Sequence, residues 1–172
     1  RYAKSIGKKY EELNLIVVHL GGGISVGAHR KGLVIDVNNA LNGEGPISPE
    51  RAGTVPSEAL ATLCFSGKYT LNEVKKMLHG KAGLAAYLGT SDMITIEEKA
   101  IEGKEPYKTL VAAMDYTVAK EIGAMFVALK GQCDAIILTG GIAYSDYCVA
   151  DIKEQIEYLC KVVVLPGENE ME

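Results

Sequence analysis

Residues 15–25 read Leu-Ile-Val-Val-His-Leu-Gly-Gly-Gly-Ile-Ser, and more of the architecture follows from this segment than from any other. Residues 15–19 form a short, nearly all-apolar run, which is typical of a buried β-strand. The glycine triplet ends that run, and residues 24–29 form a second β-rich segment. After a Lys-Gly turn signal, residues 33–37 form a third segment, rich in β-branched side chains. The pattern predicts three antiparallel strands joined by tight turns.

The rest of the chain combines helix signals with two further strand signals. Residues 38–55 are rich in Asn, Gly, Pro and Ser and are too long for a simple turn, so they predict an ordered loop. Two capping boxes, Thr70 with Glu73 and Thr95 with Glu98, predict the starts of helices. We expect the end of a helix within 1–12, helices at 56–65, 70–80, 95–103, 106–130 and 145–160, and strands at 135–138 and 162–165.

A meander followed by β-α units predicts an α/β fold, in which helices flank a mixed sheet. The length of 172 residues fits one domain, and 48% hydrophobic with 23% charged residues is ordinary for a globular protein. A net charge of −4 argues against a nucleic-acid partner, which usually needs a basic face. No apolar run approaches the roughly 18 residues of a membrane span. The four cysteines form no Cys-x-x-Cys pair, so we expect buried, reduced thiols in a cytoplasmic protein.

Two glycine clusters are candidates for binding phosphate. Gly21-Gly22-Gly23 lies in the predicted hairpin turn, where glycine tolerates positive φ and lets backbone N–H groups approach an anion, with Ser25 as a further donor. A plain hairpin turn is the alternative reading. The triplet is neither a Walker A nor a Rossmann motif, because no Gly-Lys-Ser/Thr follows and the next element is a strand. Thr139-Gly140-Gly141 follows a buried strand, where ligands of α/β sheets gather, although a tight β-α turn explains it equally well.

Together, a hairpin phosphate loop and a strand-Thr-Gly-Gly-helix loop are the pattern of the actin, Hsp70 and sugar-kinase superfold. Within that superfold the chain resembles the acetate/butyrate kinase family. The resemblance covers nearly the whole chain and is carried, in order, by His-Leu-Gly-Gly-Gly-Ile-Ser at 19–25, Pro-Glu-Arg-Ala-Gly-Thr at 49–54, Lys-Ala-Gly-Leu at 81–84, Gly-Thr-Ser-Asp-Met at 89–93 and Thr-Gly-Gly-Ile at 139–142.

Three departures make the chain similar to the butyrate branch of this family rather than the acetate branch. Acetate kinases have Gly-Asn-Gly where this chain has residues 21–23, and Gly-Glu-Asn where it has Ala143-Tyr144-Ser145. They also have Pro-Leu near Asn42-Gly43, by the acyl pocket. Smaller groups there are consistent with room for a longer acyl chain.

The resemblance implies a ribonuclease H-like ASKHA domain and a reversible reaction in which ATP phosphorylates a short-chain fatty acid, giving ADP and an acyl phosphate, with Mg²⁺. It implies that Arg51 and His19 act in catalysis, with Asp36 and Glu44 as weaker candidates to orient Arg51. It places Glu170 near the metal, unless that residue is only part of a frayed acidic terminus. The residues implied in nucleotide binding are Gly21, Gly22, Gly23, Ser25, Thr139, Gly140, Gly141 and Ile142.

Proteins of this family are about twice as long, so residues 1–172 are expected to be the C-terminal nucleotide-binding domain of a two-domain kinase. The N-terminal half and the last helix would be absent, and the domain alone would not turn over. An acetate or propionate kinase is one alternative. A nucleotide-gated switch is another, although His19 stands where actin-like proteins have Asp. A dimerisation domain is a third, since the family self-associates largely through this half, and we expect a homo-oligomer.

Overall fold

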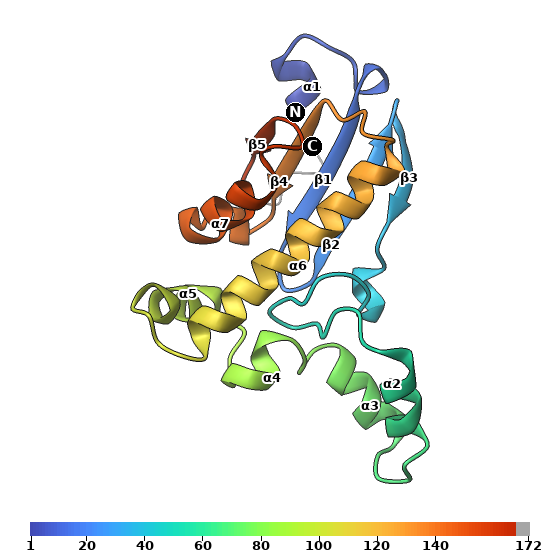
Figure 1. The fold of residues 1–172 in the computed structure, drawn as a ribbon, viewed down its shortest axis with the longest axis vertical. Helices are drawn as coiled ribbons and strands as arrows, with labels where there is room; N and C mark the ends of the chain where they lie inside the picture. The colour runs from blue at the N-terminus through green and yellow to red at the C-terminus, as the bar shows by residue number, and fades with distance from the viewer. Residues whose placement is uncertain (168–172) are drawn as a thin grey trace.

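The computed structural model describes residues 1–167, and its centre is a five-stranded mixed sheet (Figure 1). The strands β1 and β2 pair antiparallel, as do β2 and β3, whereas β4 is parallel to β1 and β5 is parallel to β4. The predicted meander and β-α units are therefore confirmed. In the spatial order β3-β2-β1-β4-β5, the strands are Leu33–Val37, Ile24–Arg30, Asn14–Leu20, Ala135–Thr139 and Val162–Val164.

The register of the sheet brings together three residues that lie far apart in the sequence. His19 on β1 is opposite Ser25 on β2 and beside Thr139 on β4. Because side chains alternate between the two faces of a sheet, these three share one face. They also share one edge, since β1 and β4 both end there. The carboxyl edge of the sheet therefore unites both predicted glycine turns.

Helices fill the connection from β3 to β4 and the crossover from β4 to β5. The predicted helices are confirmed in type, with shifts of a few residues at their ends. One short helix, α4, was not expected. The α-helices are α1 (Tyr2–Ser5), α2 (Ser57–Cys64), α3 (Leu71–Leu78), α4 (Leu84–Leu88), α5 (Met93–Ile101), α6 (Tyr107–Ala128) and α7 (Asp146–Ile156), with 3₁₀ turns at Tyr10–Glu12, Ala40–Asn42 and Ile142–Tyr144.

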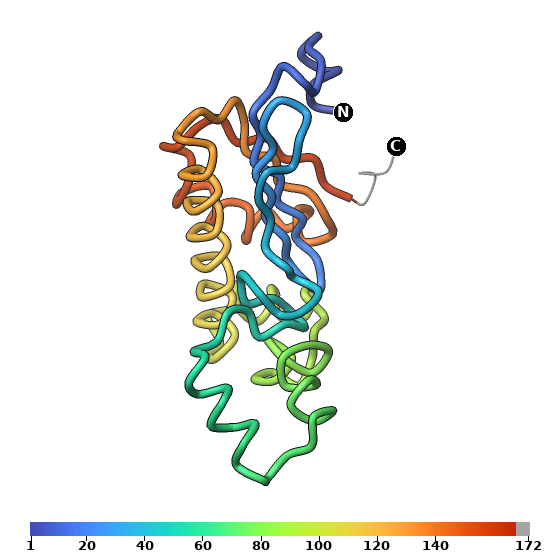
Figure 2. Tube along the Cα trace, turned by 90° about the vertical axis from the view of Figure 1, so that its right-hand side faces the viewer, coloured from blue at the N-terminus to red at the C-terminus, as the bar shows by residue number. Residues whose placement is uncertain are grey.

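The main hydrophobic core lies between one face of the sheet and the helices α6 and α7 (Figure 2). Ile16, Val18 and Leu20 on β1 are fully buried against it. The predicted stripe along α6 is confirmed, because each of its six positions is buried. Burial of an aliphatic side chain stabilises the fold by about 1.5–3 kcal/mol, so this stripe holds the helix layer on the sheet. The stripe consists of Val111, Met114, Val118, Ile122, Met125 and Leu129.

The opposite face of the sheet carries a smaller apolar cluster. Leu13, Leu15, Ala135 and Ile137 are buried there, and side chains of α1 pack against its amino-terminal end. Among the described residues no helix crosses the rest of this face (Figure 2). His19 and Ser25 are only half-buried. The predicted site residues therefore lie on the face of the sheet that α6 leaves open.

One local prediction was wrong. The helix expected from Thr95 and Glu98 begins two residues earlier, because Asp92 caps it by accepting a hydrogen bond from the Ile94 backbone at 3.3 Å. Thr95 Oγ1 donates to the Asp92 carboxylate at 2.6 Å, and this bond lowers the pKa of Asp92. Asp92 is thus a helix cap. In residues 1–12, where the end of a helix was expected, the structure has the short helix α1 and a 3₁₀ turn.

The cysteine expectation holds in part. Cys148 is buried, Cys133 and Cys160 are half-buried, and Cys64 is exposed; all four are free thiols. In residues 1–167 we find no helix with the length and apolar character needed to span a membrane.

Candidate active site

The glycine turn at 21–23 is surrounded by polar side chains. A Cβ atom on Gly21 would lie 2.9 Å from His19 Nε2, and one on Gly22 would lie 3.3 Å from Glu50 Oε2. A Cβ on Gly23 would lie 3.7 Å from Arg51 Nε. None of the three glycines has φ in the left-handed region, so close approach rather than backbone conformation requires glycine here. The turn brings together His19 and Arg51, the two side chains predicted to act in catalysis.

A short loop, Ser48-Pro49-Glu50-Arg51, delivers Arg51 to the turn. Ser48 Oγ and the Glu50 backbone N–H both donate to the carbonyl oxygen of Gly22, at 2.8 and 3.0 Å. Ser48 Oγ also accepts from the Arg51 backbone N–H at 3.1 Å, a local bond that Ser forms readily in loops. Gly83, at φ +60°, packs so tightly on Ser48 that any side chain would overlap the Ser48 carbonyl. The loop is thus fixed on both sides.

The Arg51 side chain is 21% exposed and only partly satisfied. Its Nη1 donates to the Glu50 carbonyl at 3.3 Å and lies 3.6 Å from Glu50 Oε2. Its Nε is buried and has no acceptor among the described residues. A buried donor without a partner is unfavourable, and a guanidinium can bind two oxygens of one phosphoryl group. The loop therefore presents a cation with spare donor capacity beside the glycine turn.

Glu50 is the group that the sequence analysis missed. Its side chain lies next to Gly22 and forms an ion pair with Arg51. It also accepts a hydrogen bond from Ser91 Oγ at 3.2 Å. Its position next to Arg51 in the same motif was the available signal. The predicted orienting carboxylates do not take this role: Glu44 accepts from the Asn39 backbone N–H at 2.6 Å, and Asp36 stands on the exposed strand β3.

The second glycine turn is joined to the first by backbone contact. Gly140 has φ +91°, and a Cβ there would lie 2.5 Å from the carbonyl oxygen of Leu20, which directly precedes the first turn. Gly140 and Gly167 exchange backbone hydrogen bonds of 3.0 and 3.1 Å, and Thr139 Oγ1 donates to the Gly167 carbonyl at 3.1 Å. Gly141 has no close neighbour. Glycine at position 140 therefore allows the second turn to pack against the backbone of Leu20.

A cavity of about 210 Å³ lies between the second turn and α5. Sites for drug-sized ligands usually have about 300–1,000 Å³, so this cavity has room for only part of such a ligand. The sequence analysis assigned no role to its α5 side, although the Ser-Asp-Met segment at 91–93 was noted. The lining residues are Met93, Ile94 and Glu97 of α5, and Gly141, Ile142, Tyr144 and Ser145 of the turn.

A model of the acetokinase family matches residues 1–164. The chain belongs to the acetokinase family. A probable butyrate kinase of Phocaeicola vulgatus is 72% identical over 171 residues, which are 99% of this chain and 48% of that protein. A probable butyrate kinase of Bacteroides thetaiotaomicron is 53% identical over 172 residues, or 100% of this chain and 49% of that protein. The chain thus spans about half the length of the curated relatives it matches.

The fold of this acetokinase-family chain is also found in solved structures. The crystal structure of Porphyromonas gingivalis acetate kinase matches it with a TM-score of 0.87 and 22% sequence identity, over 98% of this chain and 49% of that chain. This match confirms the predicted ASKHA-type α/β fold.

No magnesium site is evident in residues 1–167. Glu170, the residue predicted to lie near the metal, falls outside residues 1–167. Within that range no group of three or more His, Cys, Asp or Glu side chains could hold a metal ion. Kinases commonly bind Mg²⁺ through one or two carboxylates together with substrate phosphates. The described residues do not fit a preformed metal site, so no step below is routed through a metal.

The backbone conformation at position 43 requires glycine for a reason that is independent of acyl chain length. Gly43 ends the 3₁₀ turn Ala40–Asn42 at φ +86°, and a Cβ there would lie 3.3 Å from the Leu78 carbonyl. Asn42 beside it is exposed. A Pro-Leu pair at these positions would strain the turn, so Gly43 is no evidence for a wider acyl pocket.

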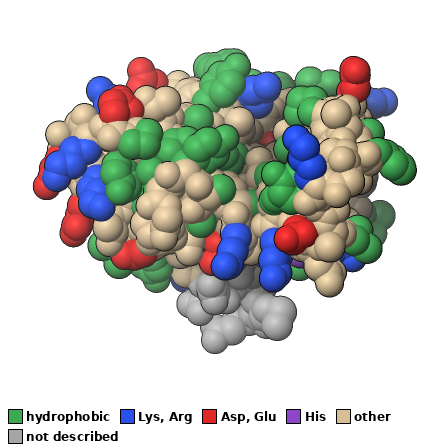
Figure 3. Space-filling view, turned by 90° about the horizontal axis from the view of Figure 1, so that it is seen from below, with side chains coloured by type: hydrophobic (Ala, Val, Ile, Leu, Met, Phe, Trp, Pro, Cys, Tyr) green, Lys and Arg blue, Asp and Glu red, His purple; other side chains and the backbone are tan. Residues whose placement is uncertain are grey.

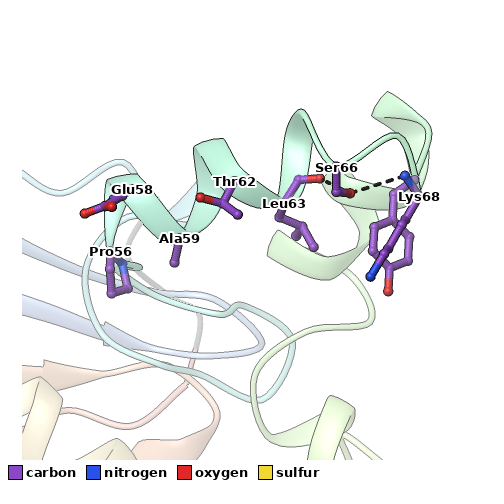
Figure 4. A pocket seen from close by; sticks show the side chains of 8 residues that line it. Pro56, Glu58, Ala59, Thr62, Leu63, Ser66 and Lys68 are labelled. Atoms are coloured by element: carbon purple, nitrogen blue, oxygen red, sulfur yellow. Dashed lines mark hydrogen bonds between the residues drawn. The ribbon is translucent and has the colours of Figure 1, made fainter.

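A second cavity, of about 630 Å³, lies along α2 and the turn into α3 (Figure 4). Its lining includes Pro56, Leu63 and Tyr69 and none of the predicted site residues. This end of the molecule also exposes Phe65, Leu71 and Met77, and hydrophobic patches alternate with charged side chains over it (Figure 3). We place the candidate active site at the carboxyl edge of the sheet instead, where the polar side chains converge.

Proposed function

We propose that this chain is the C-terminal nucleotide-binding half of a two-domain kinase that phosphorylates a short-chain carboxylate, with butyrate as the preferred substrate. ATP would give ADP and butyryl phosphate in a reversible reaction. The observation that carries the proposal is the buried, unpartnered Nε of Arg51 beside the glycine turn. The probable butyrate kinases that the chain resembles support the substrate.

In the proposed reaction a carboxylate oxygen of the fatty acid attacks the γ-phosphorus of ATP and forms a new O–P bond. The bond between that phosphorus and the β–γ bridging oxygen breaks, and ADP leaves with this oxygen. A carboxylate is ionised at neutral pH and needs no general base. Phosphoryl transfer depends mainly on alignment and on positive charge around the transferred oxygens. Arg51 would bind two of those oxygens through its free Nε and one Nη. Glu50 and Ser91 would hold the guanidinium in position.

His19 and the glycine turn would bind the same phosphoryl group from the other side. The His19 ring lies over Gly21, and Ser25 stands opposite His19 in the sheet. Backbone N–H groups of residues 21–23 can donate to anionic oxygens at a small cost in reorganisation. The Thr139–Ile142 turn and the cavity of about 210 Å³ beside it would take the nucleoside end of ATP. Glu170 is the residue that the family resemblance offers for Mg²⁺.

The remaining partners follow from the same proposal. The reaction would take place in the cytoplasm, without nucleic acid or membrane. We expect a homo-oligomer, and the edge strand β3 supports this because Leu33, Val34, Ile35 and Val37 are between 41% and 69% exposed.

The test uses the intact protein that carries this chain, with ATP, Mg²⁺ and hydroxylamine to trap the acyl phosphate. Acetate, propionate, butyrate and isobutyrate are compared at equal concentration. We expect the highest kcat/KM for acids of about three to five carbons. A maximum at acetate would keep the kinase and overturn the substrate. ATP hydrolysis without trapped product would overturn the kinase and favour a nucleotide-gated switch.

A further inference from the structure

Cys133 and Cys160 lie side by side at the amino edge of the sheet, opposite the edge where the proposed reaction takes place. Cys133 follows α6 and precedes β4, whereas Cys160 follows α7 and precedes β5. Because β4 and β5 are parallel neighbours, both crossovers return to the sheet at its amino edge. Their Sγ atoms are 3.1 Å apart, about 1 Å more than a disulfide bond.

The thiols form a short hydrogen-bonded chain. Cys160 Sγ donates to Cys133 Sγ, which donates to the Ala135 carbonyl oxygen at 3.3 Å. Both residues are half-buried, so a small oxidant can reach the pair. Burial raises the pKa of both thiols, which makes the protonated, reduced pair the resting form at neutral pH. Because only the thiolate form attacks an oxidant, we expect this pair to react slowly at neutral pH and faster as the pH rises.

We propose that Cys133 and Cys160 are a dithiol modification site, which a two-electron oxidant of the peroxide class closes to an intramolecular disulfide. The two S–H bonds break and one S–S bond forms. Hydrogen peroxide accepts the two electrons and the two protons and becomes two molecules of water. The bond would tie the α6–β4 connection to the α7–β5 connection, closing a loop of 27 residue steps between the two cysteines.

The location predicts what the bond does. Thr139 lies six positions after Cys133, mostly along the extended strand β4, which is a distance of about 20 Å. Closing the bond should therefore leave turnover within about twofold. It should raise the unfolding temperature by roughly 5–10 °C, because the cross-link lowers the conformational entropy of the unfolded chain.

The experiment treats the intact protein with hydrogen peroxide, blocks remaining thiols with iodoacetamide, and maps disulfides by mass spectrometry. Trypsin leaves Cys133 and Cys148 on one peptide, residues 131–153, so cleavage before Asp134 and Asp146 is used to separate them. A Cys64→Ser background removes the exposed thiol, which could otherwise link two molecules. Cys133→Ser and Cys160→Ser are the matched variants. Cys148, which is buried on α7, is the internal control.

We expect a peptide pair joined through Cys133 and Cys160 with the loss of two hydrogens, together with the temperature shift, and neither in the two variants. Separate oxidation of Cys160 to a sulfinic acid, a link through Cys148, or no reaction under conditions that oxidise Cys64 in the wild-type protein would each overturn the proposal. If either serine variant unfolds, the wild-type peptide map still decides between these outcomes.

Discussion

The two glycine turns at the carboxyl edge of the sheet use glycine for different reasons. In the first turn, side chains crowd the glycines: the groups nearest to residues 21–23 are His19, Glu50 and Arg51. In the second, backbone crowds Gly140, which has a left-handed φ and packs against Leu20. A side chain in the first turn would displace flexible, polar groups, whereas one at Gly140 would push two strands apart. The side chains proposed to bind the phosphates therefore line the first turn, whereas the second turn keeps the two turns in contact.

The largest effect is expected from Arg51→Ala, which removes the polar group that the first turn faces. We expect turnover of the intact protein to fall by about 10³-fold, because the transferred phosphoryl group loses its bidentate cation. Acyl phosphate formation measures it. Arg30→Ala is the matched control, since Arg30 lies at the other end of β2 and its Nη2 donates to the Ala128 carbonyl of α6. Equal activity of the two variants would remove Arg51 from the mechanism.

Gly140→Ala tests the second turn. The alanine would have to keep φ near +91° with its Cβ against the Leu20 backbone, so we expect a loss of about 3 kcal/mol in the free energy of unfolding. Gly141→Ala is the control, because Gly141 has helical φ and no neighbour within 4 Å. Denaturant unfolding distinguishes them. Equal stability of both variants would contradict the packing role of Gly140.

Asp115 on α6 makes the stability of the protein depend on pH. It is fully buried, and its carboxylate oxygens make no hydrogen bond of good geometry within residues 1–167. Burial, reinforced by Asp151 and opposed by the Cys148 thiol, raises its pKa to about 8. Because this lies above the unfolded value, the folded state binds the proton more tightly. The contribution of Asp115 to stability is greatest below about pH 4 and is lost as the pH rises to about 8, by up to about 1.4 kcal/mol per pH unit.

Asp115→Asn should therefore flatten that pH profile and leave the variant more stable than wild type by about 2 kcal/mol or more near pH 8. Urea unfolding at pH 5, 6.5 and 8 measures the slope. Parallel profiles for the two proteins would mean that another group titrates in this range.

The smallest effect is expected from Gly22→Ala. Its Cβ would lie 3.3 Å from Glu50 Oε2, the end of a flexible side chain, so the free energy of unfolding should change by less than about 1 kcal/mol. Turnover should fall about tenfold, because Glu50 holds Arg51 and its displacement misaligns the guanidinium. The comparison fails if Gly22→Ala destabilises the protein as much as Gly140→Ala does.

Local patterns predicted the elements of the fold well. The apolar run at 15–19, the glycine triplet and the stripe along α6 each depend on neighbours in sequence, and all three are found as expected. The predicted start of α5 was wrong because Thr95 fits a capping box, but Asp92 lies three residues earlier and caps the helix instead. Several candidates compete for one helix start, and only the backbone geometry decides among them.

The site was predictable in outline and not in its contacts. Arg51 and His19 come from motifs, and the structure brings both to the first turn. The bond from Ser91 to Glu50 joins residues 41 apart, and the α5 side of the small cavity comes from a helix distant in sequence. Such contacts depend on how the 48–51 loop packs on Gly83, which no local pattern contains.

The central claim is that a nucleotide binds across both turns, with its phosphates at the first. A crystal structure of the intact protein with ADP and Mg²⁺ tests it most directly. We predict the phosphates within hydrogen-bond distance of the backbone N–H groups of residues 21–23, and the nucleoside beside Met93 and Tyr144. A nucleotide bound elsewhere, for example in the cavity along α2, would contradict the account.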